Sequence, residues 1–179
     1  MNTWHLRTEE LREYAPKLQA GDNVYLTGVI YTARDAAHKR IDEALDKGEQ
    51  LPFPLQDSIV YYAGPTPTRE GMAIGSCGPT TSSRMDRFSP RLLSLGQVGM
   101  IGKGQRSPAV VDAMQKNGAV YFCAIGGAGA LYARAVKRCD VIAFEDLGCE
   151  SVKRLEVEEF PVIVSIDCHG GNLYEREQA

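Results

Sequence analysis

The segment from Gly78 to Asp86 reads GPTTSSRMD and holds the densest group of residues that could bind an anion. A Gly-Pro turn followed by four hydroxyl side chains at a helix start leaves backbone N–H groups free and adds the positive end of the helix dipole. Arg84, one turn later, could hold a carboxylate through two hydrogen bonds. Gly78, Thr80, Thr81 and Arg84 are therefore candidate ligand-binding residues. The alternative is simple helix capping by Thr80 or Thr81, with Arg84 in solvent.

Two further cations lie where one predicted element gives way to another. Arg34 follows a predicted strand and opens a predicted helix, a common position for a binding residue in α/β folds. His38 lies four residues later on the same helical face and could titrate near neutral pH or orient a neighbour. Lys103 stands between Gly102 and Gly104, on backbone that a ligand could approach closely. Each has a structural alternative: a surface Arg with a packed His, and a solvated turn.

Two other segments carry less specific patterns. Residues 126–132, GGAGALY, follow a predicted strand and open a helix as dinucleotide-binding loops do, but Tyr132 replaces the third glycine. Close packing of helix on sheet explains these glycines equally well. Asp167 and His169 alternate with apolar residues at a strand end, where two ligands alone do not make a metal site. For that pair we favour a polar turn that ends the strand.

Arg34, Arg84 and Lys103 place positive charge at three separate junctions of an otherwise acidic chain. The 179 residues include 20 Lys and Arg against 23 Asp and Glu, for a formal net charge of -3. This balance argues against a nucleic-acid-binding protein, which needs a basic face. If the fold brings the three cations together, they predict a small polyanion such as a dicarboxylate as the ligand.

The elements that must position these residues follow from apolar periodicity and glycine punctuation. Strands are expected over residues 24–32, 58–63, 72–77, 119–125, 140–144, 152–157 and 161–166, with a short apolar run at 98–101. Helices are expected over residues 33–47, 81–95 and 108–117, and from the 126–129 glycines to about 137. The last three strands have no helix between them, so a purely doubly wound parallel sheet does not fit.

Composition bounds the class of protein. A 44% hydrophobic and 24% charged chain of this length is typical of one globular domain and excludes disorder as its main state. No apolar run approaches the ~18 residues of a membrane span, and the N-terminal residues lack the apolar core of a secretory signal, so we expect a cytoplasmic protein. The cysteines are odd in number and none forms a CxxC pair: Cys77, Cys123, Cys139, Cys149 and Cys168. This pattern favours neither a disulfide framework nor a metal or iron–sulfur site in this chain alone.

These motifs occur together and in order over nearly the whole chain, and the combination resembles the C-terminal part of class I, iron–sulfur-dependent fumarases. The matching stretches are VYLTG (24–28), TARDAAHKR (32–40), YYAGP (61–65), GPTTSSRMD (78–86), GKG (102–104), GG (126–127), EDLG (145–148), FP (160–161) and DCHG (167–170). Ser82 and Ser83 depart from the Ala-Gly often found there, which lengthens two side chains beside the site without removing a ligand.

The resemblance implies a fold and a set of partners. In that family the enzyme is one long chain or two subunits, and this chain resembles the β subunit, also called the C-terminal domain. A single α/β domain over residues 1–179 is implied, with a swivelling β/β/α three-layer architecture and mixed sheets. A cluster-bearing α subunit is also implied: it would hold the [4Fe–4S] cluster, this chain would bind no metal, and the site would lie between the two parts. We expect a hetero-oligomer, with a β homodimer as a further arrangement.

The resemblance also implies a reaction, the reversible hydration of fumarate to L-malate. Arg34, Arg84 and Lys103 match the family's carboxylate-binding cations, which would stabilise the carbanion-like charge that develops as C3 loses its proton. Thr80 matches a threonine at the reacting centre, although a Thr hydroxyl is a poor base unless a neighbour activates it. The implied site comprises catalytic Thr80, Arg84 and Lys103, substrate-binding Arg34, Thr81 and Gly78, and, behind the site or at an interface, His38, Asp167 and His169.

Three alternatives stay open. The L-tartrate dehydratase β subunit has the same two-part plan, but Ala33 and the YYAGP stretch favour fumarase. A stand-alone domain that binds a nucleotide or small anion would rest on residues 126–129. A structural scaffold would require none of the three cations.

Overall fold

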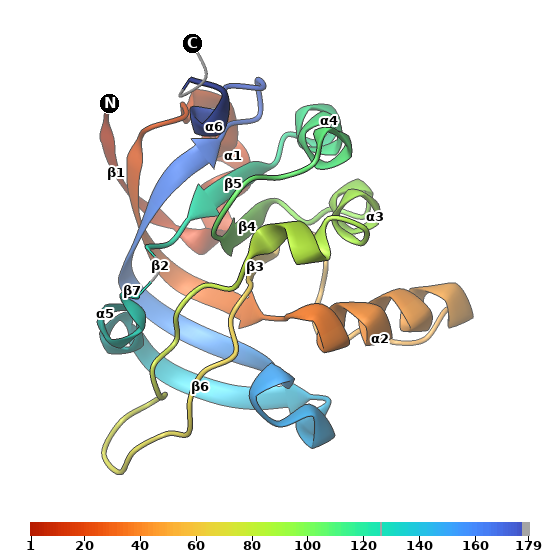
Figure 1. The fold of residues 1–179 in the computed structure, drawn as a ribbon, viewed down its shortest axis with the longest axis vertical. Coiled ribbons are helices and arrows are strands. Elements are labelled where there is room, and N and C mark those ends of the chain that lie inside the picture. Colours follow the sequence, from red (N-terminus) through yellow and green to blue (C-terminus); the bar gives the residue numbers. More distant parts are fainter. Residues whose placement is uncertain (126, 177–179) are drawn as a thin grey trace.

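The computed structural model describes residues 1–125 and 127–176, and its framework is a mixed seven-stranded sheet (Figure 1). The strands are β1 (Thr3–Arg7), β2 (Asn23–Thr32), β3 (Ile59–Tyr61), β4 (Gly99–Gly102), β5 (Val120–Cys123), β6 (Val136–Ala143) and β7 (Val152–Ile166). They lie in the order β1-β2-β3-β4-β5-β7-β6, and β2 also pairs with β7. This extra pairing closes β2, β3, β4, β5 and β7 into a barrel.

Strand direction decides where loops gather. Each neighbouring pair from β1 to β5 is parallel, whereas β7 runs antiparallel to β2, β5 and β6. The carboxyl ends of β2, β3 and β4 therefore meet at one edge of the barrel. Ligand sites of α/β proteins commonly form at such an edge.

Helices cover the barrel unevenly. The α-helices are α1 (Leu11–Tyr14), α2 (Asp35–Lys47), α3 (Ser89–Ser94), α4 (Pro108–Asn117), α5 (Gly129–Ala135) and α6 (Leu173–Arg176). The 3-10 helices are η1 (Thr8–Glu10), η2 (Ala15–Lys17), η3 (Ser82–Met85) and η4 (Glu145–Glu150). Figure 1 shows α2, α3 and α4 on one side of the sheet, with β6 at its lower edge and β7 rising from there toward α6. The expected α/β class with mixed sheets is confirmed. None of the helices in the described ranges has the length and apolarity needed to cross a membrane.

Two apolar cores hold these layers together. Inside the barrel, the Phe160 ring lies 5.3 Å from the Tyr61 ring and 4.9 Å from the Tyr132 ring, measured between centroids. Between the sheet and α2, α3 and α4, a second core includes Ile41 and Tyr62. Fully burying one such side chain contributes on the order of 1.5–3 kcal/mol, so the two cores fix the loops at the barrel edge.

Several predicted elements differ from the structure. Residues 72–77 form no strand: Ile74 and Cys77 are buried, but the segment is a loop. The helix predicted over 81–95 is interrupted: η3 ends at Met85, and a separate helix, α3, begins at Ser89 with Pro90 in its first turn. The strands predicted over 152–157 and 161–166 are one strand, which bends at Glu159 (φ 52°). Strand β1 and helix α1 were not predicted. Helix α4 begins and ends where the Ser-Pro and Gly signals place it.

Candidate functional site

Three loops meet at the shared carboxyl edge of β2, β3 and β4. Arg34 follows β2 in extended conformation and precedes the first residue of α2, while Lys103 follows β4 directly. The chain after Gly78 then returns across these strand ends. The Thr80 N–H donates to the Tyr62 carbonyl at 2.7 Å, and Thr81 pairs with Lys103 in a short parallel bridge. Segments that lie far apart in the sequence are thus joined by backbone hydrogen bonds at this edge.

The Arg84 side chain links this returning segment to α2. Its Nε donates to Asp35 Oδ2 at 2.7 Å, so Arg84 lies beside the turn that carries Arg34. The Arg84 side chain is 52% exposed, and Lys103 is exposed as well. Within residues 1–125 and 127–176, the terminal nitrogens of Arg84 and the Lys103 ammonium donate no hydrogen bond. These groups are available to an anion from outside the chain.

Arg34 is more enclosed, and its surroundings are incompletely paired. A Cβ on Gly64 would lie 2.9 Å from Arg34 Nη1, so the glycine makes room for the guanidinium. Glu150 Oε1 lies 4.0 Å from Arg34 Nε, too far for a hydrogen bond. Among the described residues, Arg34 Nε, Asp35 Oδ1 and His38 Nε2 are buried polar atoms without a hydrogen-bond partner. Buried polar groups are normally satisfied, so this turn is suited to receiving a further group.

His38 lies behind Arg34 rather than in solvent. Its Nδ1 is 2.8 Å from the Arg34 carbonyl, and its ring meets the Tyr62 ring edge-on at 5.4 Å. Burial lowers the pKa of His38 from 6.5 to about 4. The neutral ring therefore donates its Nδ1–H to the Arg34 carbonyl near neutral pH, and this bond fixes the backbone of Arg34.

A buried arginine beneath the site has no counterpart in the sequence analysis. The side chain of Arg106 is 0% exposed, its Nε donates to Asp86 Oδ1 at 2.6 Å, and its Nη2 donates to Ser89 Oγ at 2.8 Å. Nothing in the local sequence distinguishes Arg106 from a solvated arginine, because its partners come from other segments. It joins the loop that carries Lys103 to the segment that carries Arg84.

The threonines do not cap a helix. Thr81 occupies the N-cap position of η3, yet its side chain makes no capping hydrogen bond, and η3 has only four residues. The dipole of a long helix, predicted at this point, is therefore missing. Thr80 is half-buried, Thr81 is exposed, and Gly78 packs beside Gly129. The site offers hydroxyls and cations rather than a helix terminus. Ser82, expected beside the site, instead turns its buried hydroxyl inward.

Asp167 and His169 lie beyond the opposite end of β7, away from the three cations. His169 Nε2 lies 2.8 Å from the Pro16 carbonyl. The Asp167 carboxylate accepts three backbone N–H bonds, each at 2.9 Å, from Ala20, His169 and Gly171. The structure therefore shows a polar turn here and does not bring this pair to the edge with the cations.

The glycine-rich segment packs against Cys77 and Gly78. Gly126 lies outside the described residues, and α5 begins at Gly129, whose carbonyl accepts a hydrogen bond from Cys77 N–H at 3.1 Å. The Tyr132 hydroxyl accepts the Ile125 N–H at 2.6 Å. A Cβ on Gly129 would lie within 3.2 Å of Cys77 N, which explains the glycine by close packing.

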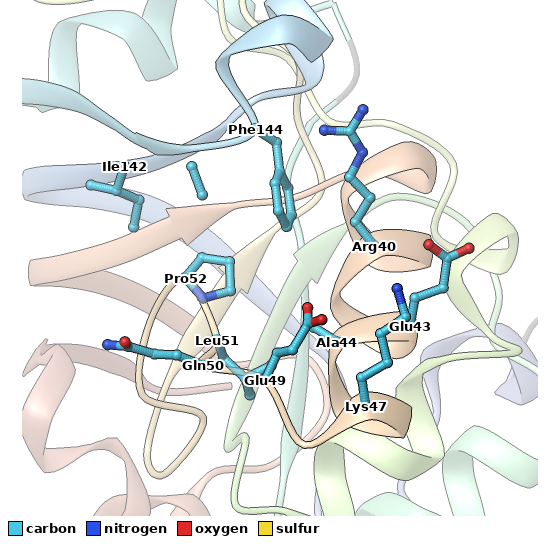
Figure 2. A pocket seen from close by; sticks show the side chains of 11 residues that line it. Arg40, Glu43, Ala44, Lys47, Glu49, Gln50, Leu51, Pro52, Ile142 and Phe144 are labelled. Atoms are coloured by element: carbon cyan, nitrogen blue, oxygen red, sulfur yellow. The ribbon is translucent and has the colours of Figure 1, made fainter.

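A cavity of about 530 Å³ opens elsewhere, between α2 and the end of β6 (Figure 2). Figure 2 shows Arg40 and Lys47 on α2, with Ile142 near the end of β6 and Phe144 directly after that strand. The Arg40 guanidinium is already bound to both carboxylate oxygens of Asp146, at 2.8 and 2.5 Å. The lining contains none of the predicted site residues, so the candidate site is an open edge of loops and not this cavity.

The described residues offer no ligand set for a metal or cluster. No three His, Cys, Asp or Glu side chains within them lie close enough to hold an ion. The cysteines are dispersed in their environments: Cys77 and Cys168 are buried, Cys123 and Cys139 are half-buried, and Cys149 is exposed. The residues present therefore do not fit an iron–sulfur cluster held by this chain.

Comparison with known proteins matches the sequence model of the family described as Fumarase C-terminus to residues 1–177. The chain is 40% identical over 173 residues to "Fumarate hydratase 2" of Leishmania major, covering 96% of this chain and 30% of that protein. It is 38% identical over 172 residues to "Fumarate hydratase class I, aerobic" of Salmonella typhimurium, covering 95% and 30%. It is 44% identical over 165 residues to "Putative L(+)-tartrate dehydratase subunit beta" of Methanocaldococcus jannaschii, covering 89% and 85%. The chain thus spans about a third of the fumarate hydratases that it matches.

Proposed function

Because this chain belongs to the fumarase C-terminus family, we propose that it is the β subunit of a two-part hydro-lyase that interconverts fumarate and L-malate. Its relatives include proteins named fumarate hydratase and a protein named as a dehydratase β subunit. In this proposal an α partner holds the iron–sulfur cluster, because the described residues provide no ligands for it.

The observation that carries the proposal is the meeting of Arg34, Arg84 and Lys103 at one edge of the barrel. Arg84 is tied to the Arg34 turn through Asp35, and Lys103 is tied to the same returning segment through Thr81. Three cations on three loops suit the two carboxylates of a C4 diacid. The terminal nitrogens of Arg84 can bind one carboxylate through two hydrogen bonds, and Lys103 adds a point charge.

These cations would act on the charge that develops during proton removal. Loss of the C3 proton makes a carbanion-like species whose negative charge spreads onto the neighbouring carboxylate. Donors already held in place stabilise such charge without reorganising, and losing one costs about 2–4 kcal/mol, or roughly 30- to 1000-fold in rate. Thr80 lies at the same edge and could carry the proton, but no side chain in the described ranges is hydrogen-bonded to its hydroxyl. We assign the group that activates it to the α partner.

The printed name of one relative supports a second subunit. The chain covers 85% of a protein named as a putative L(+)-tartrate dehydratase subunit beta. An open edge of loops, with buried polar atoms of Arg34, Asp35 and His38 left unpaired, is also what a site shared with another chain requires.

Tartrate is the alternative substrate. The 44% identity to the L(+)-tartrate dehydratase β subunit, over nearly its whole length, favours it. The second hydroxyl of tartrate would need an added hydrogen-bond partner. A substrate panel on the assembled enzyme separates the two, since a preference for tartrate over malate replaces fumarate in the proposal.

The test is anaerobic reconstitution. The chain is co-expressed with an α subunit of the class I type, the cluster is rebuilt, and fumarate loss is followed by ultraviolet absorbance. We expect activity in the complex only, and its loss in Arg84→Ala. Arg87→Ala is the matched control, because Arg87 is an exposed arginine stacked on Phe88 at 4.7 Å. Equal activity of both variants would contradict the assignment of Arg84, and tight binding of NAD by the isolated chain would favour a nucleotide-binding domain.

A further inference from the structure

A buried hydroxyl connects the two loops that carry Arg84 and Lys103. Tyr121 lies on β5 with its side chain buried, and its hydroxyl donates to the Gly104 carbonyl at 2.8 Å. The same oxygen lies 2.9 Å from Ser82 Oγ. Ser82 precedes Arg84 by two residues, and Gly104 directly follows Lys103. One hydroxyl on a barrel strand therefore fixes both loops.

A second connection runs through Arg106. Its guanidinium binds Asp86 Oδ1 at 2.6 Å, and the other oxygen of that carboxylate accepts the Ser107 N–H at 2.7 Å. The guanidinium carbon also lies 4.9 Å from the centroid of the Tyr121 ring. Asp86 is two residues past Arg84, so the Arg106–Asp86 pair also joins the two loops. Arg106 and Tyr121 are in contact and form one unit.

The two loops are also closely packed. The Ser82 N–H donates to the Lys103 carbonyl at 2.9 Å. A Cβ on Gly102 would overlap Ser82 Oγ and lie 2.9 Å from the Tyr62 ring, so the loops have no room to slide. A fully satisfied network of buried polar groups is rigid.

Stability alone does not explain a network of this kind. A buried ion pair is often no more stabilising than apolar residues of similar volume, because both charges lose their hydration. The hydroxyl and the guanidinium meet the backbone and side chains of the Arg84 and Lys103 loops. Both therefore act on the geometry of the two exposed cations.

We propose that the Tyr121 hydroxyl and the Arg106 guanidinium are positioning groups that set the separation of Arg84 and Lys103 for the substrate carboxylate. The inference rests on the proposed function for its catalytic consequence. Tyr121 and Arg106 do not touch the substrate in this proposal. They act through the two loops, and a displacement of about 1 Å at a reacting centre can lower the rate about 100-fold.

Tyr121→Phe is the informative variant, because it removes one oxygen and leaves the ring against Arg106. In the assembled enzyme we expect kcat/KM to fall between about 10- and 100-fold. Tyr132→Phe is the matched control: it removes another buried tyrosine hydroxyl with one backbone bond, to Ile125, away from both loops. We expect that control to retain wild-type kcat/KM.

A double-mutant cycle separates positioning from general damage. If Tyr121 acts through the placement of Lys103, the fall caused by Tyr121→Phe shrinks several-fold in the Lys103→Met background. Fully multiplicative effects, or an unchanged kcat/KM in Tyr121→Phe alone, would overturn the proposal.

Hydrogen–deuterium exchange on the isolated chain gives a readout that needs no activity. We expect Tyr121→Phe to speed amide exchange in residues 80–86 and 102–107, and Tyr132→Phe to leave those residues unchanged. The proposed function fails if the wild-type complex does not hydrate fumarate and does not release water from malate or tartrate. The exchange result still decides, in that case, whether Tyr121 holds the two loops. Unchanged exchange in Tyr121→Phe refutes the inference whatever the enzyme does.

Discussion

Protonation of His38 is expected to destabilise the fold at mildly acidic pH. The ring is fully buried, and burial lowers its pKa from 6.5 to about 4. The Arg106 charge acts in the same sense, whereas the hydrogen bond to the Arg34 carbonyl and the Asp35 carboxylate act against it. Because the folded pKa lies below the unfolded one, the unfolded chain binds the proton first as the pH falls.

The size of the effect follows from the two pKa values. Their difference is about 2.5 pH units, and each unit is worth about 1.4 kcal/mol. The free energy of unfolding should therefore fall by about 3 kcal/mol through this group as the pH drops from about 6.5 to about 4, with the full stability present above 6.5. Against a typical total of ~5–15 kcal/mol, this is a large fraction.

Urea unfolding of the wild type and of His38→Gln, between about pH 7.5 and about pH 4.5, measures this contribution. Glutamine does not titrate and can still donate to the Arg34 carbonyl. The pH dependence that the carboxylates contribute is common to both proteins, so it cancels in the difference between their free energies of unfolding. We expect the difference to shrink or change sign as the pH falls. His169→Gln is the matched control, since His169 is exposed and its ring lies 2.8 Å from the Pro16 carbonyl. A wild-type-minus-His38→Gln difference that is constant across the range would refute the reasoning.

Three further predictions concern packing and reactivity. Asp167→Ala leaves three backbone N–H groups without their acceptor and should lower the free energy of unfolding by about 2–4 kcal/mol in urea titrations, with dicarboxylate affinity unchanged in calorimetry. Gly102→Ala places a methyl group on Ser82 Oγ, and this overpacking should lower the free energy of unfolding by about 1–3 kcal/mol and the melting temperature by several degrees. An unchanged melting temperature would show that the loops can shift. Iodoacetamide near neutral pH should label exposed Cys149 before Cys77, whose pKa burial raises to about 12, and peptide mass mapping that finds the reverse order would contradict the burial of Cys77.

Local signals account for the elements that were predicted correctly. Gly48 and Gly118 end α2 and α4 in the left-handed conformation (φ 65° and 64°), which glycine adopts without strain. Both helix ends were visible in the sequence, because the signal lies within the element itself. The apolar runs at 152–157 and 161–166 predict two strands where the structure has the single strand β7. It continues past Pro161 because β2 pairs with it on both sides of the bend at Glu159, and that ladder is not local.

The candidate site divides in the same way. Arg34, Arg84 and Lys103 could be proposed from the sequence because each stands at a junction between predicted elements, and Arg84 and Lys103 also have hydroxyl or glycine neighbours. Arg106 and Tyr121 could not be, since a buried arginine and a strand tyrosine have ordinary local sequences. Their importance comes from partners 20 and 39 residues away, Asp86 and Ser82. The sequence pattern could not identify these two residues, because their burial depends on contacts between distant segments.

Closure of the barrel has a consequence for biosynthesis. One edge of β2 pairs with β1 and β3, whereas its other edge pairs with β7, which is synthesised last of the strands. Asn23 lies opposite Ile163 in that pairing. At about 5–20 residues per second, the ribosome needs on the order of ten seconds to supply the intervening chain. During that interval a long apolar strand edge stays open to other chains. The yield of folded protein should therefore depend on translation speed and on chaperones that shield nascent chains, even though β7 pairs with β2 from Asn23 to Thr32 in the finished barrel.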